Sequence, residues 1–444
     1  MKFARFLSDF GMVLVLVLLG AFFSFATYSE QSPRGEAAAR QISATLRQQF
    51  GLTPGVLIAA SDQPGDPEFA TKLEHDLTAS GARVLAVVKG EPREARAALV
   101  KIAATGAKLD AIAATEVAGA WLVFADLKQD FPALGTASLV TPRRYHWPNF
   151  LKSENLLNIA NQIAVIAIVA IGMTMVIITG GIDLSVGSLI ALSAVLAALL
   201  IRDFAGGVQA TAIGLVLACA AAVLVCGLVG GFSGAMITRF GIPPFIVTLA
   251  MMLVASGVAY ILAKGQSIYQ IPDSFIWLGR GADFLHLPNA VVLMVLLYAL
   301  AHVLMTRFVT GRQLYAVGGN REAARLSGVP IQRVILLAYV ASGLLAGLGG
   351  VIMASQLKSG SPTYGNMYEL YVIAAVVVGG TSLAGGEGRM LGTLTGAFTI
   401  AVIQNGMNLT NVESYTQKVV LGLVILGAVG LDKFRQVRTA TRRQ

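Results

Sequence analysis

The chain has 444 residues, of which 55% are hydrophobic and only 13% are charged. This balance is typical of integral membrane proteins and excludes an ordinary soluble globular domain. The formal net charge of +9 would also suit a nucleic-acid-binding protein, but the basic residues are scattered over predicted loops and a C-terminal tail. Membrane topology therefore explains the charge better than nucleic-acid binding does.

Residues 1–28 predict an N-terminal transmembrane anchor helix. A basic start, residues 1–10, precedes an apolar stretch over 11–26, and the run Ser24-Phe-Ala26 also resembles the cleavage site of a signal peptide. The apolar stretch is long for a signal peptide, and Asp9 is unusual in the basic start, so we favour the uncleaved anchor.

Residues 29–146 break the membrane pattern and predict an inserted extracytoplasmic α/β domain with a parallel sheet, because short strand-like runs alternate with helical ones. Gly81 and Gly106 stand where helix-ending glycines belong, and Pro67 and Pro92 stand near helix starts. We predict strands at 55–60, 83–89, 109–114 and 133–140, helices at 67–80, 92–105 and 117–129, and a connecting helix from the membrane at 34–50.

Residues 147–431 predict an all-α polytopic membrane domain, followed by a basic cytoplasmic tail over 432–444. With the N-terminal anchor, the chain has about ten transmembrane elements, at 11–28, 159–180, 187–201, 210–237, 242–263, 289–306, 331–354, 368–380, 388–407 and 416–431. The element at 368–380 is too short to span a bilayer as a lone helix. Cys219 and Cys226 lie seven apart in one apolar stretch, which suits small packing residues better than a disulfide.

The distribution of basic residues orients the chain in the membrane. Lys2 and Arg5 precede the first span, the loop 307–333 holds five arginines against the single acid Glu322, and the tail is basic. We therefore expect cytoplasmic N- and C-termini and a periplasmic insert over 29–150. The segments 202–209, 264–288, 356–367 and 408–415 are expected outside as well.

Two glycine-rich breaks, one around residues 181–187 and the other around residues 379–382, interrupt the apolar stretches. Asp183 lies in the first break, and a carboxylate near the bilayer centre costs at least roughly 2.5–3.5 kcal/mol. The first break either caps the following helix through Asp183 or Ser185, or, with the second break, marks a translocation path. Close helix packing explains most single glycines. Path or gating candidates in the two breaks are Gly181, Asp183, Ser185, Gly187, Gly379, Gly380, Thr381 and Ser382.

Asn405 and Asn408 fall near the outer end of a predicted helix. They either offer hydrogen bonds to a passing polyol or satisfy neighbouring helix ends, and the sequence leaves both interpretations open.

A short helix is predicted within the loop segment 312–330, ending at Gly328 and Pro330. So short a helix has little of its own to bury, and it suits a rigid knob held in the groove of a partner. An interfacial turn whose arginines meet lipid phosphates is the alternative. The candidate coupling residues are Arg321, Glu322, Ala323, Arg325, Leu326, Ser327 and Gly328.

From residue 147 to the C-terminus the chain resembles permease subunits of sugar-importing ATP-binding-cassette transporters of the ribose/xylose/galactose type. The motifs that carry the resemblance are Pro148-Asn-Phe-Leu151, Gly181-Ile-Asp-Leu-Ser-Val-Gly-Ser188, Ala316-Val-Gly-Gly-Asn-Arg-Glu-Ala-Ala-Arg-Leu-Ser-Gly-Val329, Ala374-Ala-Val-Val-Val-Gly-Gly-Thr-Ser-Leu-Ala-Gly-Gly-Glu-Gly-Arg389 and Asn405-Gly-Met-Asn-Leu409.

The resemblance implies a permease that carries a sugar or sugar-like solute across the bacterial inner membrane. It implies no cofactor on this chain, with ATP and Mg²⁺ bound by cytoplasmic ATPase subunits that contact the knob. The other implied partners are a second permease copy or homologue, a periplasmic sugar-binding protein and the lipid bilayer. The substrate is not fixed among pentoses, hexoses, polyols and autoinducer-like sugars.

The insert has a resemblance of its own. The runs Val56-Leu-Ile-Ala-Ala-Ser61, Asp66-Pro-Glu-Phe69 and Leu109-Asp-Ala-Ile112 resemble the first lobe of a ribose-type periplasmic binding protein. Glu68 replaces the aromatic residue that would stack on a sugar, and the second lobe is absent. We therefore expect a structural cap or docking module, with a regulatory small-molecule site as the alternative.

Other classes of protein fit the sequence less well. The chain has no Gly-x-x-x-x-Gly-Lys-Ser/Thr loop, so we expect no ATPase and no other enzyme activity of its own. No cluster with metal-binding spacing appears, and nucleic acid is not an expected partner. The rivals are an ion-gradient-driven transporter that uses Asp183, Glu369 or Glu387, and a receptor that senses a ligand through the insert.

Overall fold

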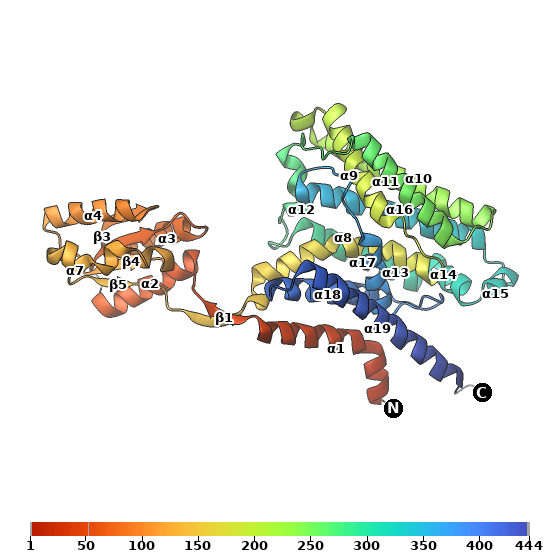
Figure 1. The fold of residues 1–444 in the computed structure, drawn as a ribbon, viewed down its shortest axis with the longest axis horizontal. Helices are drawn as coiled ribbons and strands as arrows, with labels where there is room; N and C mark the ends of the chain where they lie inside the picture. The colour runs from red at the N-terminus through yellow and green to blue at the C-terminus, as the bar shows by residue number, and fades with distance from the viewer. Residues whose placement is uncertain (1, 52, 442–444) are drawn as a thin grey trace. The chain divides into compact units, whose positions relative to one another are not determined.

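The computed structural model describes the backbone of residues 2–51 and 53–441 and the side chains of residues 11–51 and 53–430. The chain forms two compact units, one of Met1–Thr27 with Asn149–Gln444 and the other of Tyr28–Pro148. Figure 1 shows the elements of each unit. The basic side chains that we used for orientation at Lys2, Arg5 and 432–444 lie outside the described residues.

The smaller unit contains a four-stranded parallel sheet with helices on both faces. Alternate residues of β2 point to opposite faces, because Val56 and Ile58 join the cluster under α2 and α3, whereas Leu57 and Ala59 join the cluster under α4 to α7. The strands run in the order β3-β2-β4-β5. Their bounds are β2 Gly55–Ala60, β3 Arg83–Lys89, β4 Ala111–Ala114 and β5 Ser138–Val140, and the helices are α2 Gly35–Phe50, α3 Asp66–Ala79, α4 Pro92–Thr105, α5 Glu116–Gly119, α6 Leu122–Ala125 and α7 Leu127–Asp130.

Three elements of this unit differ from the prediction. The strand expected at 133–140 is shortened to Ser138–Val140, because Pro132–Leu134 forms a 3-10 helix. The helix expected at 117–129 is broken into α5, α6 and α7, because Trp121 takes an extended backbone (φ −68°, ψ 133°) that lets its ring stack on Phe124 at 5.9 Å. The helix expected to connect the membrane with the sheet, α2, instead packs against the sheet, with Ile42 and Leu46 fully buried.

An antiparallel ribbon of β1 (Tyr28–Gln31) and β6 (Tyr145–Pro148) brings the two ends of the smaller unit together. The chain leaves the larger unit at Thr27 and re-enters it at Asn149. These two residues lie side by side, because the backbone amide of Asn149 donates to the carbonyl of Thr27 at 3.0 Å. The backbone amide of Phe150 also donates to the Thr27 hydroxyl at 3.0 Å. This paired arrangement was not predicted from the sequence.

The larger unit is a bundle of helices, and within its described residues six helices are long and apolar enough to cross a membrane. These six are α8 Ser153–Ile178, α9 Val186–Asp203, α10 Ala212–Arg239, α11 Pro244–Ala263, α13 Asn289–Arg307 and α16 Ile331–Leu357. The other helices are α1 Lys2–Ala26, α12 Trp277–Arg280, α14 Val309–Gly319, α15 Arg321–Leu326, α17 Tyr368–Val378, α18 Met390–Leu409 and α19 Ser414–Thr441.

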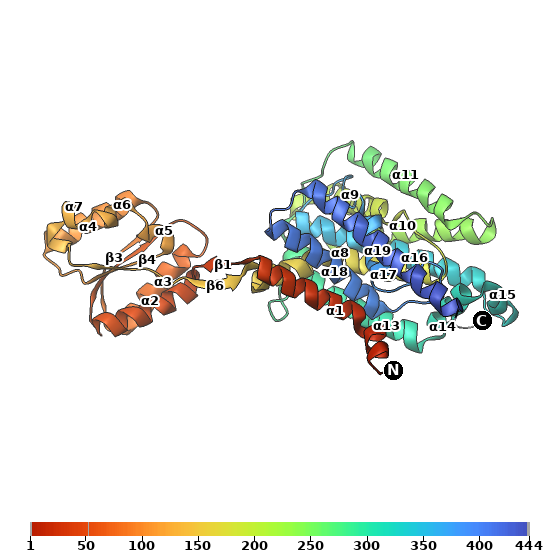
Figure 2. The same ribbon diagram turned by 60° about the horizontal axis from the view of Figure 1, so that its bottom comes forward.

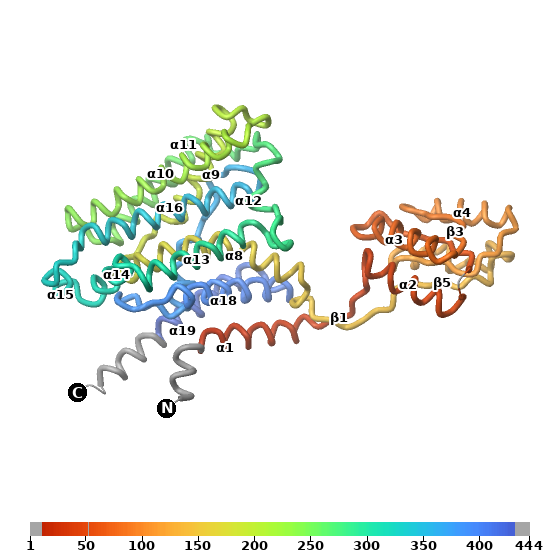
Figure 3. Tube along the Cα trace, turned by 180° about the vertical axis from the view of Figure 1, so that it is seen from behind, coloured from red at the N-terminus to blue at the C-terminus, as the bar shows by residue number. Residues whose placement is uncertain are grey.

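Helices α10 and α16 approach very closely, and Figure 3 shows them running alongside each other. A Cβ atom on Gly230 would overlap the carbonyl oxygen of Tyr339, and one on Gly343 would overlap that of Cys226. Glycine is required at both places because only a missing side chain allows this approach. Both cysteines, Cys219 and Cys226, are free, as predicted.

Helix α1 packs along α18 (Figure 2). The Phe23 ring is only 6% exposed and stacks on the Phe150 ring at a centroid distance of 6.1 Å. A Cβ atom on Gly406 of α18 would overlap that same ring. The first helix is therefore integrated into the core of the larger unit.

The segment between α16 and α17 includes most of the stretch that we expected outside, 356–367, and part of it packs into the protein. Ser359, Ser361 and Pro362 are buried, because glycines at 360 and 365 let the backbone lie directly on α9. The amide and carbonyl of Gly360 also exchange hydrogen bonds with Ile268, at 2.9 and 2.8 Å.

Candidate functional site

Helix α15 forms the predicted knob. Its start is capped by Asn320, whose side-chain oxygen accepts from the amide of Ala323 at 2.9 Å, and it ends before Gly328, which has a left-handed φ of +77°. The guanidinium of Arg325 donates to the Glu322 carboxylate at 3.0 Å (Nε to Oε1). The seven candidate coupling residues are all exposed, and Leu326 has an exposed fraction of 79%.

One residue of this helix was missed from the sequence. Ala324 is 4% exposed and belongs to the core cluster of the larger unit. The knob is therefore anchored by a single small side chain, while a polar and apolar surface around it is free to contact another molecule.

The first break, 179–185, is closed around Asp183. This carboxylate is 1% exposed and accepts three hydrogen bonds: from the Ser185 amide at 3.0 Å, the Ser185 hydroxyl at 2.6 Å and the Ser342 hydroxyl of α16 at 2.8 Å. The neighbouring carbonyl of Ile182 accepts from the hydroxyl of Tyr339 at 3.3 Å. The hydrogen-bond donors of this membrane carboxylate all belong to its own chain. The carboxylate therefore stabilises the fold locally.

Gly181 and Gly187 are both required by close approaches. A Cβ atom on Gly181 would lie 2.6 Å from the Tyr339 hydroxyl. One on Gly187 would overlap the Glu369 carboxylate and the carbonyl of Gly365. Glu369 was considered from the sequence only as an ion site of a gradient-driven transporter.

The second break, 379–389, is more open. Gly380 is exposed with a φ of +88°, and Gly379 packs against the backbone of Gly392. The Thr381 hydroxyl is buried without a hydrogen-bond partner among the described residues. The Ser382 hydroxyl accepts from the amide of Ala384 at 3.3 Å.

The two breaks meet on α14, at a cluster of four residues that we name the glycine junction: Gly180, Gly318, Gly385 and Gly386. The amide of Gly386 donates to the carbonyl of Ile178, at the end of α8, at 2.9 Å. A Cβ atom on Gly385 would lie 3.1 Å from both the Gly180 amide and the Gly318 carbonyl, and one on Gly318 would overlap the Ile178 carbonyl.

Helix α14 makes a second link with the later break, because the Tyr315 hydroxyl donates to the carbonyl of Gly388 at 2.8 Å. Since α14 ends at Gly319 and the knob begins at Arg321, the junction joins the knob directly to both breaks.

Asn405 and Asn408 bind neighbouring side chains. Asn405 and Asn155 form a reciprocal amide pair, with distances of 2.9 and 3.0 Å, and the Asn408 side-chain oxygen accepts from Gln417 at 2.8 Å. Both amides therefore have partners within the chain, and contact with a passing solute stays a prediction.

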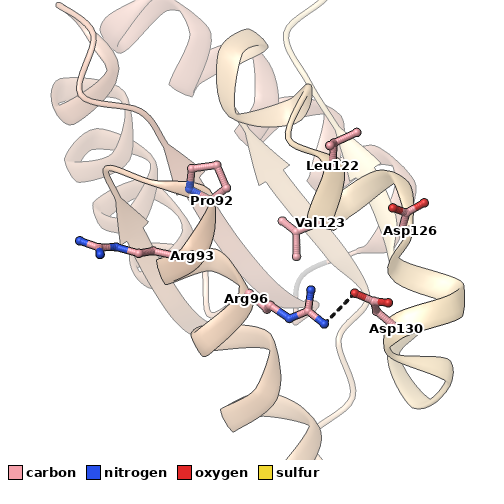
Figure 4. A pocket seen from close by; sticks show the side chains of 7 residues that line it. All are labelled: Pro92, Arg93, Arg96, Leu122, Val123, Asp126 and Asp130. Atoms are coloured by element: carbon pink, nitrogen blue, oxygen red, sulfur yellow. Dashed lines mark ion pairs between the residues drawn. The ribbon is translucent and has the colours of Figure 1, made fainter.

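The insert has no obvious sugar site at its strand ends. The buried carboxylate of Asp66 accepts from the hydroxyls of Ser61 and Thr115, at 2.5 and 2.8 Å, so these groups satisfy one another. One surface depression lies between α4 and α6–α7, where Arg96 pairs with Asp130 at 3.0 Å (Figure 4). A second lies over α2 and α3 and includes Glu68. Neither lining includes a phenylalanine, tyrosine or tryptophan side chain.

Metal ligands are not gathered in the described part of the chain. Within it, no group of three or more His, Cys, Asp or Glu side chains is placed to hold a metal ion.

Comparisons with known proteins match the larger unit. A family model described as "branched-chain amino acid transport system / permease component" matches residues 155–429. The ribose import permease protein RbsC of Escherichia coli K12 is 42% identical over 293 residues, which cover 65% of this chain and 88% of the relative. RbsC of Bacillus subtilis 168 is 42% identical over 304 residues, covering 68% and 92%.

The D-allose transport system permease protein AlsC of E. coli K12 is 34% identical over 284 residues, covering 64% of this chain and 85% of the relative. In each pair, far more of this chain than of the relative lies outside the match. No solved structure matches the chain significantly.

Proposed function

This chain belongs to the family of transport-system permease components that its ribose and allose relatives represent, and we propose that it is the membrane subunit of an ATP-binding-cassette importer for a sugar or sugar-like solute. As a member of a permease family it is embedded in the inner membrane and does not itself perform the chemistry of ATP hydrolysis. The observation that carries the proposal beyond the family is the exposed knob α15, joined through the glycine junction to both breaks.

In this proposal the knob is the contact with the ATPase. Two cytoplasmic ATPase subunits bind ATP and Mg²⁺, and the groove of each receives one α15. The exposed Leu326 offers an apolar contact, and Arg321, Glu322 and Arg325 surround it with charge. When the ATPases close, α15 moves with them and α14 carries the displacement to the junction, since a backbone-to-backbone contact has no flexible side chain to absorb it.

Ten membrane elements complete the proposed topology. The six long helices are supplemented by α1, α17, α18 and α19, with both termini in the cytoplasm and the smaller unit in the periplasm. The packing of Phe23 against Gly406 supports an uncleaved α1. A second permease copy, or a homologue, would form the opposite wall of the solute path.

For the smaller unit we propose a structural or docking role beside the separate periplasmic sugar-binding protein. The closed network around Asp66 supports this role over ligand binding, as does the lack of phenylalanine, tyrosine and tryptophan among the lining residues of the two depressions.

The test is to co-purify the chain with the ATPase and binding protein encoded beside it, and to reconstitute the complex in lipid. We expect a bound ATPase whose activity rises with a sugar-loaded binding protein, and ATP-dependent uptake of that sugar. A chain that purifies alone and transports along an ion gradient without ATP would contradict the proposal. Signalling through the insert with no transport would favour a receptor.

A further inference from the structure

The segment that precedes α17 runs along a membrane helix. Gly360 lies against Ala194 and Ala198 of α9, and Gly365 lies against Gly187 and Ile190 of the same helix. The segment therefore follows α9 for about two helical turns, roughly 11 Å at 1.5 Å per residue.

Helix α17 supplies only the remaining part of a crossing. Its 11 residues have a length of about 16 Å, roughly half of a hydrocarbon core of about 30 Å. Non-helical backbone at this depth is tolerated only where protein buries it or where it lines a water-filled cavity.

One side of the segment is buried by protein, and the other side is not. Ser359, Ser361 and Pro362 face the protein and are buried, whereas Thr363, Asn366, Met367 and Leu370 are exposed. We name residues 363–370 the open segment. The exposed side chains of Thr363 and Asn366 are polar, and polar side chains at membrane depth face a bundle interior or a water-filled cavity rather than lipid.

The open segment carries an acid with no strong partner. Glu369 is half-buried, and its carboxylate lies in the space left by the missing side chain of Gly187. Among the described residues it makes no ion pair. An ionisable side chain within a membrane body is retained for function by default.

We propose that the open segment lines the solute path and that the Glu369 carboxylate accepts hydrogen bonds from hydroxyl groups of the passing sugar. This inference rests on the proposed function and adds a substrate-contacting residue to it. A carboxylate has lone pairs for several hydroxyl donors, so it recognises a polyhydroxylated solute without demanding one stereochemistry. The open face of Asn366 beside it adds both a donor and an acceptor.

The first test measures uptake in proteoliposomes that hold the complete transporter, with D-ribose, D-allose and L-arabinose as probes. We expect Glu369→Gln to lower the uptake of the transported sugar about tenfold, which is the loss of one charge-assisted hydrogen bond, with thermal stability unchanged. Glu369→Ala should lower uptake further, because it removes both acceptors.

Glu154→Gln is the matched control, since Glu154 is also a first-turn glutamate but is exposed on α8. It should transport as the wild type does. Wild-type uptake by Glu369→Gln would overturn the inference alone. A wild-type protein that takes up none of the probes with ATP would overturn the proposed function, and the inference with it.

The second test asks whether water reaches the open segment. We expect Asn366→Cys in the reconstituted transporter to react with a membrane-impermeant thiol reagent, and the transported sugar to slow the reaction. The unmutated chain gives the background from Cys219 and Cys226. A cysteine at 366 that does not react in any nucleotide state would mean that a second copy seals this face, and would overturn the inference.

Discussion

Two carboxylates within the membrane body have contrasting surroundings. Asp183 is 1% exposed and accepts three hydrogen bonds from Ser185 and Ser342. Glu369 is half-buried, and it makes no ion pair within the part of the chain that the structure describes. Asp183 is conspicuous in the sequence because it interrupts an apolar stretch, yet its lone pairs are used by its own chain. The comparison teaches that the acid available to a solute is the one that the fold leaves unsatisfied.

The largest effect is expected at Asp183. Replacing it with alanine leaves the buried hydroxyls of Ser185 and Ser342 without an acceptor, and each costs about 1–3 kcal/mol. Asp183→Ala should therefore lower the thermal stability in detergent and the yield of folded protein, and Asp183→Asn, which keeps one acceptor, should lower them less. We argue that Asp183 stabilises the fold and that Glu369 contacts the solute. An Asp183→Ala variant as stable as the wild type that failed to transport would contradict this difference.

The second effect concerns the link between the closed break and the knob. Gly318→Ala forces apart the carbonyl of Ile178 and the end of α14, an overpacking that costs about 1–3 kcal/mol. Transport per ATP hydrolysed should fall. Gly319→Ala, one residue later and with open space around it, should leave both transport and ATP hydrolysis unchanged. Equal behaviour of the two variants would show that the junction carries no coupling.

The third prediction joins the two acids at Gly187. An alanine there displaces the Glu369 carboxylate, so uptake should fall by a factor similar to that of Glu369→Gln. In the double variant with Glu369→Ala the overlap with the carboxylate is gone, and stability should recover partly. Gly257→Ala in α11, where nothing lies within 4 Å, is the control and should transport normally.

The smallest effect is expected at Asn405. Its amide pair with Asn155 is half-buried, so Asn405→Ala should cost about 1 kcal/mol of stability. The Michaelis constant for the sugar should not change, because these amides bind each other. A raised Michaelis constant at full stability would instead assign Asn405 to the solute path, as we propose for Glu369.

Sequence reasoning succeeded where a local signal decides the structure. Helix α4 begins at Pro92 and ends before Gly106, where both signals stood in the sequence, and the knob ends before Gly328 in the same way. The free cysteines and the exposed arginines of the knob also agree with their periodicity and charge.

Sequence reasoning failed where distant segments decide. Nothing near Ser342 marks it as the partner of an acid 159 residues away. Gly318 stands in a helix like many other glycines, and only the approach of Ile178 makes it special. The segment before α17 carries one proline, Pro362, with two serines and two glycines, and its burial follows from the close approach of Gly360 and Gly365 to α9.

The paired chain ends described for each unit have an evolutionary meaning. Since Thr27 and Asn149 are hydrogen-bonded neighbours in one unit, and Tyr28 and Pro148 are register partners in the other, a gene encoding the smaller unit could enter or leave the larger one at a single point. A transporter ancestor would have needed no new backbone path to accept the graft. We expect a shortened chain that joins residue 27 to residue 149 through a tight turn to fold, because the two residues are already hydrogen-bonded neighbours.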